Sequence, residues 1–371
     1  MDASVNRIPT SKDERALLIS VILPRQNRTE SDYSLEELKL LVKTAGAVVV
    51  EAMTVKREKI DSAYIIGKGF LEKLKTIVEE KNLKVIIFDL DNTRPAQIRN
   101  LEEHLNCRVV GRTEVILDIF AARARSAESK IQVEMAQLNY ILPRLKGYGG
   151  ILSRTGGGIG TRGPGETMLE TDRRHILKRI SKLKEDLKKY EKHRSLSRKS
   201  RHDIFKIAVA GYTNAGKSTL INVLAKDDLF VEDRLFATLD SYTRKVYLNP
   251  ELTVLMTDTV GFIKNLPTNL IASFKSTIEE ISYADMILVV SDVTSPYLEE
   301  QITTVENELS ALSTDKPVFY FFNKCDSAGV EALNMVKSEF PDAVYGSALT
   351  GAGLDTLISV ITENAGKMKL S

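Results

Sequence analysis

The stretch Phe205-Lys-Ile-Ala-Val-Ala-Gly-Tyr-Thr-Asn-Ala-Gly-Lys-Ser-Thr219 joins an apolar run to a turn with two glycines and a closing Lys-Ser-Thr. The apolar run predicts a buried strand, and the residues after Thr219 predict a helix. A P-loop needs this context, because its glycines let backbone N–H groups wrap phosphate oxygens at the N-terminus of a helix. The stretch therefore predicts an α/β domain that binds a phosphate-bearing ligand.

The loop offers candidate ligands for a nucleotide and for a magnesium ion. We expect Lys217 to reach the β- and γ-phosphate oxygens and the Ser218 hydroxyl to ligate Mg²⁺. The sequence leaves open whether Asn214 also helps to bind a monovalent cation. The candidate nucleotide-binding residues of the loop are Gly211, Tyr212, Thr213, Asn214, Ala215, Gly216, Lys217, Ser218 and Thr219.

Two motifs further along the chain complete the expected phosphate site. Asp258-Thr-Val-Gly261 follows the apolar run 253–256 and offers a carboxylate near the magnesium and a backbone amide for the γ-phosphate. Thr238 lies twenty residues after Ser218 and is either a switch-loop ligand of the magnesium or a loop threonine without a role. The candidate catalytic residues are Lys217, Thr238 and Gly261, and the candidate metal ligands are Ser218, Thr238 and Asp258.

A third motif, Asn323-Lys-Cys-Asp326, follows the apolar run 318–322 and predicts the base. The Asp326 carboxylate can accept from both the ring N–H and the amino group of guanine, whereas adenine offers neither donor there. An unpaired carboxylate would disfavour the wrong base by ~10⁴-fold or more, so GTP is the expected substrate of a GTP hydrolase. The candidate base-binding residues are Asn323, Lys324 and Asp326, with Ser347, Ala348 and Leu349 closing over the base.

The residue after Gly261 is unusual for this kind of site. Ras-like GTPases place a glutamine there to orient the attacking water, and this chain has Phe262. A phenylalanine cannot hold a water molecule, so we expect slow intrinsic hydrolysis. Either a partner or another residue must position the water, which would make the enzyme a switch that acts on docking.

Upstream of residue 113, apolar strand-like runs alternate with helix-like runs. The pattern predicts a β-α-β-α-β-α-β unit with a four-stranded parallel sheet. Gly67-Lys-Gly69, before its second helix, is open to two interpretations, an anion cradle or a plain loop. The expected strands are 17–23, 47–54, 85–90 and 108–110, and the expected helices are 34–44, 70–80 and 95–105.

Two long helical stretches follow, one predicted over 113–145 and one beginning near Glu166. Apolar residues recur in both at alternating spacings of four and three, which predicts packing seams between antiparallel helices. These residues are Ile131, Met135, Leu138, Leu142 and Leu145 in the first stretch, and Ile176, Ile180, Leu183, Leu187 and Tyr190 in the second.

Residues 147–165 join the two helices and contain nine glycines. A nucleotide cradle is one interpretation, but no strand precedes the glycines and no Gly-Lys-Ser/Thr follows. A flexible linker and a contact with RNA are the other two. Glycines admit phosphates close to the backbone, and arginines add charge and stacking. The candidate RNA-contacting residues are Arg154, Gly157, Gly158, Gly160, Arg162, Gly163, Arg173 and Arg174.

Charge is distributed unevenly along the 371 residues, although the net charge is only +2. Residues 203–371 hold 13 Lys+Arg and 23 Asp+Glu, net −10, whereas residues 1–202 hold 39 and 27, net +12. The basic part is a candidate polyanion binder or simply a solvated basic helix. The two cysteines and the short apolar runs predict a cytoplasmic protein without disulfides and without a membrane span.

The stretch Gly156-Gly-Gly-Ile-Gly-Thr-Arg-Gly-Pro-Gly-Glu-Thr-Met-Leu-Glu-Thr-Asp-Arg-Arg174 resembles the HflX family of ribosome-associated GTPases. Ile66-Gly-Lys-Gly69 and Phe236-Ala-Thr-Leu-Asp240 support the resemblance. It implies an N-terminal α/β domain, a hairpin that contacts RNA near the peptidyl-transferase region of the large ribosomal subunit, and a GTPase domain stimulated by that subunit. It also implies that the protein dissociates stalled ribosomes. Longer members carry a further domain, whereas about twenty residues follow Gly351 here, enough for one helix.

The expected fold is α/β: a small parallel-sheet domain (1–112), an antiparallel helical hairpin with a glycine-rich tip (113–202) and a Ras-like P-loop GTPase domain (203–371). We expect a monomeric GTP hydrolase that binds the large ribosomal subunit and couples GTP turnover to ribosome dissociation or rescue. Two other functions share the same nucleotide residues. One is a ribosome-assembly or RNA-modifying GTPase, and the other is a GTP-gated RNA-binding module.

Overall fold

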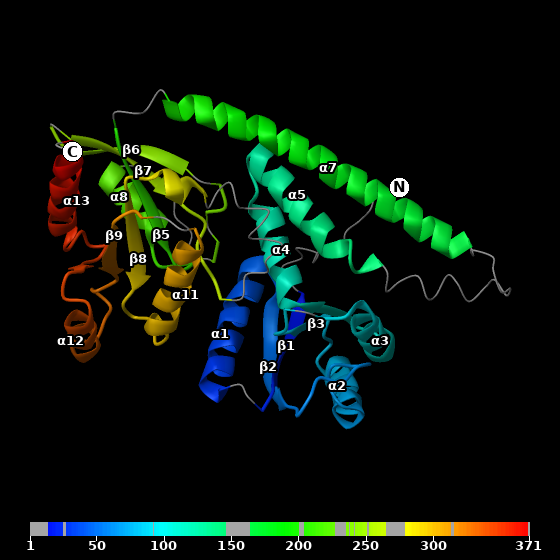
Figure 1. Cartoon of the computed structure of the whole chain (residues 1–371). Coiled ribbons are helices and arrows are strands. Elements are labelled where there is room, and N and C mark those ends of the chain that lie inside the picture. The colour runs from blue at the N-terminus through cyan, green and yellow to red at the C-terminus, as the bar shows by residue number, and fades with distance from the viewer. Residues whose placement is uncertain are drawn as a thin grey trace. The chain divides into compact units, whose positions relative to one another are not determined.

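The computed structural model (Figure 1) describes residues 14–24, 27–91, 93–145, 164–199, 204–226, 235–236, 238–240, 242–250, 252–264, 279–312 and 315–369. The described residues form two compact units. One contains residues 14–122 and 130–189, and the other contains residues 123–129 and those from 190 on. None of the described helices has the length and hydrophobicity that a membrane-spanning segment needs.

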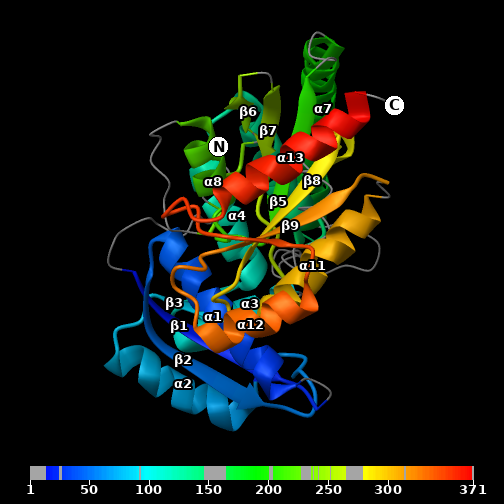
Figure 2. The same cartoon turned by 90° about the vertical axis from the view of Figure 1, so that its left-hand side faces the viewer.

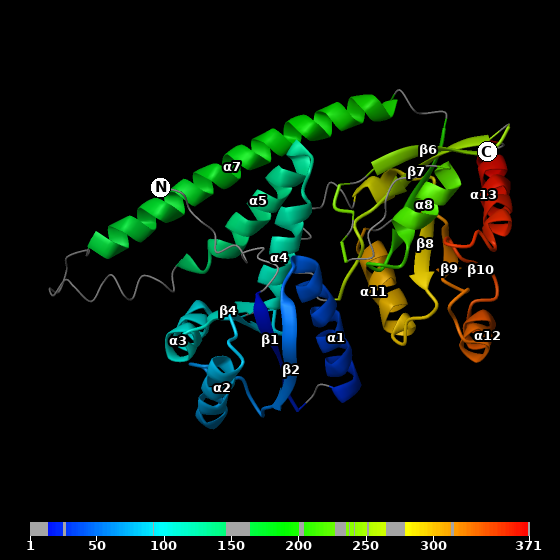
Figure 3. The same cartoon turned by 180° about the vertical axis from the view of Figure 1, so that it is seen from behind.

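The N-terminal unit contains the predicted four-stranded parallel sheet. Its strand order is β2-β1-β3-β4, and the central strands β1 and β3 are buried almost throughout. Helix α1 covers one face, and α2 and α3 pack against the other (Figures 1 and 3). The elements are β1 (Arg15–Ile22), α1 (Arg28–Ala45), β2 (Val48–Lys56), α2 (Lys68–Glu80), β3 (Val85–Phe88), α3 (Pro95–Leu105) and β4 (Arg108–Gly111).

The first long helical stretch is two helices, α4 (Arg112–Arg123) and α5 (Ala127–Ile141), so the prediction of one helix over 113–145 is wrong. The Ser126 hydroxyl accepts from the Ser129 N–H at 3.0 Å and caps α5. The Arg125 and Ser126 N–H groups donate to the Asp240 carboxylate instead of continuing α4. A serine and a distant carboxylate end the helix without glycine or proline, which explains why the local pattern did not show the break.

Helix α7 (Pro164–Lys199) packs antiparallel to α5 along the predicted seam. Met135, Ile180 and Leu183 are buried there, flanked by the half-buried Ile131, Leu138, Leu142, Ile176 and Leu187. Arg179 adds a two-pronged ion pair to Glu134, at 2.6 and 2.7 Å. The glycine-rich tip between the two helices lies outside the described residues.

The second unit contains a six-stranded sheet of order β10-β9-β8-β5-β7-β6, in which only β6 runs antiparallel to its neighbour (Figure 2). β5 lies between β7 and β8, so the P-loop leaves the sheet where the strand order reverses, the usual place for a ligand. The elements are β5 (Phe205–Gly211), α8 (Lys217–Ala225), β6 (Tyr242–Asn249), β7 (Leu252–Asp258), η3 (Glu279–Tyr283), β8 (Met286–Asp292), α11 (Leu298–Ala311), β9 (Val318–Asn323), α12 (Val330–Glu339), β10 (Val344–Tyr345) and α13 (Leu354–Lys369).

Candidate functional site

The loop after β5 adopts a backbone conformation that requires glycine at two positions. Gly211 and Gly216 have φ angles of +144° and +94°, which side chains disfavour. A Cβ atom on Gly211 would lie 2.1 Å from the Val290 carbonyl oxygen, and one on Gly216 would lie 2.2 Å from Asn323 Nδ2. The loop therefore packs too closely against β8 and β9 for any other residue, and α8 begins directly after it at Lys217.

Lys217 is buried at the first position of α8 and folds back over the loop. Its Nζ donates to the carbonyl oxygens of Gly211 at 3.1 Å and Tyr212 at 2.8 Å. Burial lowers the pKa of Lys217 to about 8, although the Asp258 carboxylate acts in the opposite direction. A buried cation held by two neutral carbonyl groups is well placed to exchange them for a phosphate anion.

Three oxygen-bearing side chains meet beside the start of α8. Ser218 Oγ donates to Asp258 Oδ2 at 2.5 Å, Thr238 Oγ1 donates to the same oxygen at 2.9 Å, and the two hydroxyl groups lie 2.8 Å apart. Asp258 is buried, which raises the pKa of its carboxyl group. Its Oδ1 has no hydrogen-bond partner within the described part of the chain. Such an oxygen-only set with one unpaired carboxylate oxygen suits a hard divalent cation that also binds phosphate.

Asn323 ties the base-recognition motif to the rest of the site. This buried side chain donates from Nδ2 to the Ala215 carbonyl at 2.9 Å and accepts at Oδ1 from the Ala348 N–H at 2.8 Å. Lys324 donates to the Asn214 carbonyl at 3.1 Å and pairs with Asp292 at 2.7 Å. The P-loop and the 347–349 segment are thus both fixed to the end of β9.

Asp326 lies exposed at the end of the same motif. Hydrogen bonds from the Ser347 and Ser327 hydroxyl groups hold the pKa of its carboxyl group below the usual range, so the carboxylate stays ionised. Ser347 and Ala348 are buried, whereas the Leu349 side chain is 82% exposed. The predicted base-binding residues therefore lie together, with an anionic acceptor facing solvent.

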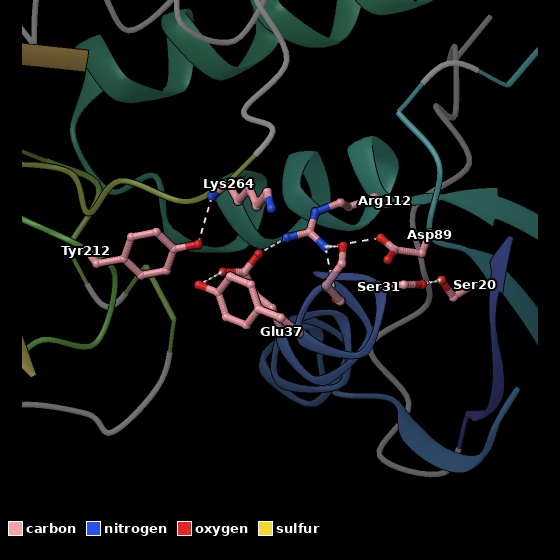
Figure 4. Close-up of polar contacts among 9 residues, drawn as sticks. Ser20, Ser31, Glu37, Asp89, Arg112, Tyr212 and Lys264 are labelled. Atoms are coloured by element: carbon pink, nitrogen blue, oxygen red, sulfur yellow. Dashed lines mark hydrogen bonds and ion pairs between the residues drawn. The ribbon is translucent and has the colours of Figure 1, made fainter. Parts of the chain in front are cut away.

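Phe262 is buried and belongs to a short parallel bridge with the P-loop. Its N–H donates to the Gly211 carbonyl at 3.1 Å, and its carbonyl accepts from the Thr213 N–H at 2.8 Å. Next to it, the Tyr212 hydroxyl accepts from the Lys264 N–H at 2.8 Å (Figure 4). The segment after β7 is thus hydrogen-bonded to the P-loop at three points, and its aromatic side chain points into the core.

A second polar cluster, which the sequence did not reveal, lies at the carboxyl ends of the strands in the N-terminal unit. Buried Arg112 pairs with Glu37 and, at 3.1 Å, with Asp89 (Figure 4). Its Nη1 also donates to the carbonyl and hydroxyl oxygens of Ser34, both at 3.2 Å. The carboxylates compensate the buried charge, so we interpret the cluster as structural.

The structure leaves the proposed RNA-contacting residues of the glycine-rich tip outside its described part. These are Arg154, Gly157, Gly158, Gly160, Arg162 and Gly163. Arg173 and Arg174 lie on α7 and are exposed.

One residue near the nucleotide site also escaped the sequence interpretation. Asp240 lies two residues after Thr238 in the quoted stretch Phe236-Ala-Thr-Leu-Asp240, and its carboxylate contacts the start of α5. No local pattern could show this contact, since its partners are 114 and 115 residues away.

Three family models match consecutive parts of this chain. The model described as "GTP-binding GTPase N-terminal" matches residues 32–121, and "GTP-binding GTPase Middle Region" matches 123–201. The model "50S ribosome-binding GTPase" matches residues 206–324. Together they account for most of the described residues of both units.

Full-length relatives show the same similarity. The chain is 50% identical over 351 residues to "GTPase HflX" of Caldanaerobacter subterraneus subsp. tengcongensis, covering 94% of this chain and 80% of that protein. It is 38% identical to "GTPase HflX" of Escherichia coli, covering 94% and 82%. A GTP-binding protein from Sulfolobus solfataricus, solved with GDP, shares the fold with a TM-score of 0.51 at 22% identity, covering 96% of this chain and 99% of that one.

Proposed function

Because the chain belongs to the HflX family of GTPases, we propose that it binds the large ribosomal subunit and couples GTP turnover to ribosome dissociation or to the rescue of stalled ribosomes. It works in the cytoplasm as a monomer of three domains: 1–112, 113–202 and 203–371. This membership confirms the resemblance that the glycine-rich stretch indicated. GTP hydrolysis is the activity of the second unit, which contains the matched GTPase region.

Ser218, Thr238 and Asp258 would hold a magnesium ion in this proposal. The gathering of their three oxygens and the unpaired Asp258 Oδ1 support it. When bound, the ion would neutralise charge on the β- and γ-phosphate oxygens. Lys217 then exchanges its carbonyl partners for phosphate oxygens, and the Gly261 amide holds the γ-phosphate. Thr238, which lies beside Ser218 and Asp258, would add its hydroxyl to the ion once the γ-phosphate is present.

Guanine is read by Asn323, Lys324 and Asp326, with Ser347, Ala348 and Leu349 beside the base. The ionised Asp326 accepts two donors that only guanine presents. Asn323 also holds the base-binding segments together, since both ends of its amide bond to other parts of the site, the P-loop and Ala348.

In this proposal the free protein hydrolyses GTP slowly, because the Phe262 side chain cannot orient a water molecule. The Phe262 side chain is 2% exposed, and its backbone is bonded to the P-loop. A partner must therefore complete the site, as trans-acting partners do for other GTPases. The large subunit is that partner.

The exposed basic face of α7 is the observation that carries ribosome binding. Ile180 and Leu183 bury one side of the helix against α5, while the opposite side exposes lysines and arginines. A run of cations on one helix face, next to a tip with nine glycines, suits the phosphate backbone of RNA. The exposed basic residues of α7 include Arg173, Arg174, Lys178, Lys182, Lys184, Lys188, Lys189 and Lys192.

Sedimentation with purified large subunits in GTP, GDP and a non-hydrolysable analogue tests the proposal. We expect co-sedimentation in the analogue, little in GDP, and multiple-turnover splitting of 70S ribosomes in GTP. Lys188→Glu with Lys189→Glu should weaken binding and flatten its salt dependence by roughly one unit of slope per lost phosphate contact. Lys73→Glu with Lys75→Glu, on exposed positions of α2, makes the same charge change and is the matched control.

Each failure has a distinct meaning. Binding without splitting would favour a ribosome-assembly or RNA-modifying GTPase. Binding that follows the nucleotide, with no splitting in GTP and no acceleration of hydrolysis by large subunits, would favour a GTP-gated RNA-binding module. Absence of binding at low salt in all three nucleotides would contradict the proposed function.

A further inference from the structure

Thr238 lies on a short segment that is anchored at both ends. At one end, the Phe236 N–H donates to the Thr213 hydroxyl of the P-loop at 3.0 Å. At the other end, Asp240 accepts three hydrogen bonds from the start of α5. Between the anchors, Leu239 is buried. The position of the Thr238 hydroxyl therefore depends on both attachments.

Both carboxylate oxygens of Asp240 take part in the second anchor. Oδ2 accepts from the Arg125 and Ser126 N–H groups, each at 3.3 Å, and Oδ1 accepts from the Ser126 hydroxyl at 2.5 Å. The Ser126 hydroxyl in turn accepts from the Ser129 N–H and caps α5. One serine thus belongs to the helix cap and to the anchor, so the first turn of α5 and Asp240 are linked directly.

The same region holds the ends of both hairpin helices. Residues 123–129 and those of α7 from 190 on belong to the compact unit that carries the nucleotide site, whereas the rest of α5 and α7 belongs to the other unit. Arg194 of α7 pairs with Glu128 of α5 and, at 3.1 Å, with Glu280 of η3. The first residues of α5 and the last residues of α7 therefore lie in the same compact unit as Asp240.

We propose that Asp240 is a positioning residue for GTP hydrolysis, which holds Thr238 beside Ser218 and Asp258 by anchoring the 238–240 segment to the start of α5. Two residues of extended chain span at most ~7 Å, so Asp240 stays within that distance of Thr238, and any larger movement of Asp240 away from Thr238 displaces Thr238 as well. The segment then has two states. In the first state, Thr238 lies beside Ser218 and Asp258, and Asp240 is hydrogen-bonded to the start of α5. In the second state, Thr238 has moved away, and the hydrogen bonds between Asp240 and α5 are broken. Nucleotide and hairpin partner bias the same pair of states, and their effects on each other's affinity must be reciprocal.

Amide hydrogen exchange in the isolated full-length chain tests the coupling without ribosomes. We expect the amides of Arg125, Ser126 and Ser129 to exchange more slowly, by about 10-fold, in a non-hydrolysable GTP analogue than in GDP. Asp240→Ala should abolish this difference. Equal exchange in both nucleotides for the wild type, or a difference that survives in Asp240→Ala, would overturn the proposal.

Nucleotide binding and hydrolysis give the second readout. Asp240→Ala should lower the affinity for the analogue and the hydrolysis rate by about 10-fold, while GDP affinity changes little, because Thr238 acts only with the γ-phosphate. Asp240→Asn keeps an acceptor oxygen for the two backbone N–H groups and should recover most of the loss. Asp61→Ala is the matched control, since Asp61 also accepts from two backbone N–H groups, those of Ala63 and Tyr64, without any link to Thr238. Wild-type hydrolysis in Asp240→Ala would remove Asp240 from the reaction.

The inference rests on the proposed metal role of Thr238, and Thr238→Ala separates the two. If Thr238→Ala leaves analogue affinity and hydrolysis unchanged, the metal role fails, and the exchange result alone then decides whether Asp240 couples the nucleotide to α5. If Thr238→Ala impairs both and Asp240→Ala impairs neither, the metal role stands and the positioning role of Asp240 is wrong.

Discussion

At the scale of single residues, the candidate phosphate site contains two buried ionisable groups whose charged forms need a bound ion of opposite charge. Asp258 is buried with one oxygen unpaired in the described structure, and Lys217 is buried against neutral carbonyl groups. Burial raises the pKa of the first and lowers that of the second to about 8, so both shifts disfavour the charged form. A bound metal ion would compensate the charge of Asp258, and a bound phosphate would compensate the charge of Lys217. Ligand binding would therefore stabilise the charged forms of both residues.

Removal of magnesium should reveal which side chains act through the ion. In Mg²⁺, Ser218→Ala should lower GTP affinity by about 10-fold or more, since a metal ligand is lost. In EDTA, wild type and Ser218→Ala should bind GTP alike. Ser359→Ala, on α13, is the control, because that hydroxyl bonds only locally to the Asp355 carbonyl. A Ser218→Ala defect of the same size with and without Mg²⁺ would show that the hydroxyl does not act through a metal.

Replacement of Asp326 by Asn tests base recognition. The change puts an amide donor opposite two guanine donors, so GTP affinity should fall by roughly 10²-fold, with xanthine nucleotide partly restored. Direct titration of both nucleotides measures this. Asp342→Asn, at an exposed position of the same unit, should bind GTP as wild type does. Unchanged GTP affinity in Asp326→Asn would remove that carboxylate from the site.

The candidate nucleotide residues could be proposed from the sequence because each chemical task needs a residue type at a short, fixed spacing. Gly211, Gly216 and Lys217 lie within seven positions, and the strand and helix around them are locally encoded. Contacts such as Asn323 to Ala348 or Asp240 to Ser126 join segments whose approach is decided by the tertiary fold. No spacing rule links such pairs, so the structure had to show them.

At the scale of elements, the parallel sheets were predictable and the helix boundary at 124–126 was not. Strands such as β1 and β3 are continuous apolar runs because both faces are covered, and that pattern is read easily. The break between α4 and α5 depends on the Ser126 cap and on Asp240, and no glycine or proline marks it in the sequence. The apolar stripe nevertheless predicted the partner surface of α5 correctly, since Met135 packs with Ile180 and Leu183.

Truncation within this seam should open the hairpin without affecting nucleotide binding. Leu183 is 1% exposed, so Leu183→Ala should lower the local free energy of unfolding of α7 by about 2–4 kcal/mol. Leu177 on the same helix is 45% exposed, and Leu177→Ala should change the local free energy of unfolding of α7 by about 1 kcal/mol or less. Native-state hydrogen exchange of the α7 amides measures both variants. Equal protection in the two variants would contradict the packing role of the seam.

At the scale of the whole molecule, the glycine-rich tip and the nucleotide site lie in different parts of the chain, joined by α5 and α7. Shortening the tip from Gly156 to Gly165 should therefore leave GTP affinity unchanged, because the P-loop lies beyond α7. Docking on large subunits should persist through the basic helix, whereas 70S splitting should be lost. A shortened protein that splits ribosomes at the wild-type rate would show that the tip is only a linker.

The rate of GTP hydrolysis with and without purified large ribosomal subunits tests the central claim most directly. With Phe262 buried where a glutamine would orient water, the free protein should turn over slowly, and large subunits at saturating GTP and low salt should accelerate it by at least ~10²-fold. Small subunits at the same concentration are the control and should have little effect. Equal rates with and without large subunits would contradict the account of a GTPase completed by its ribosomal partner.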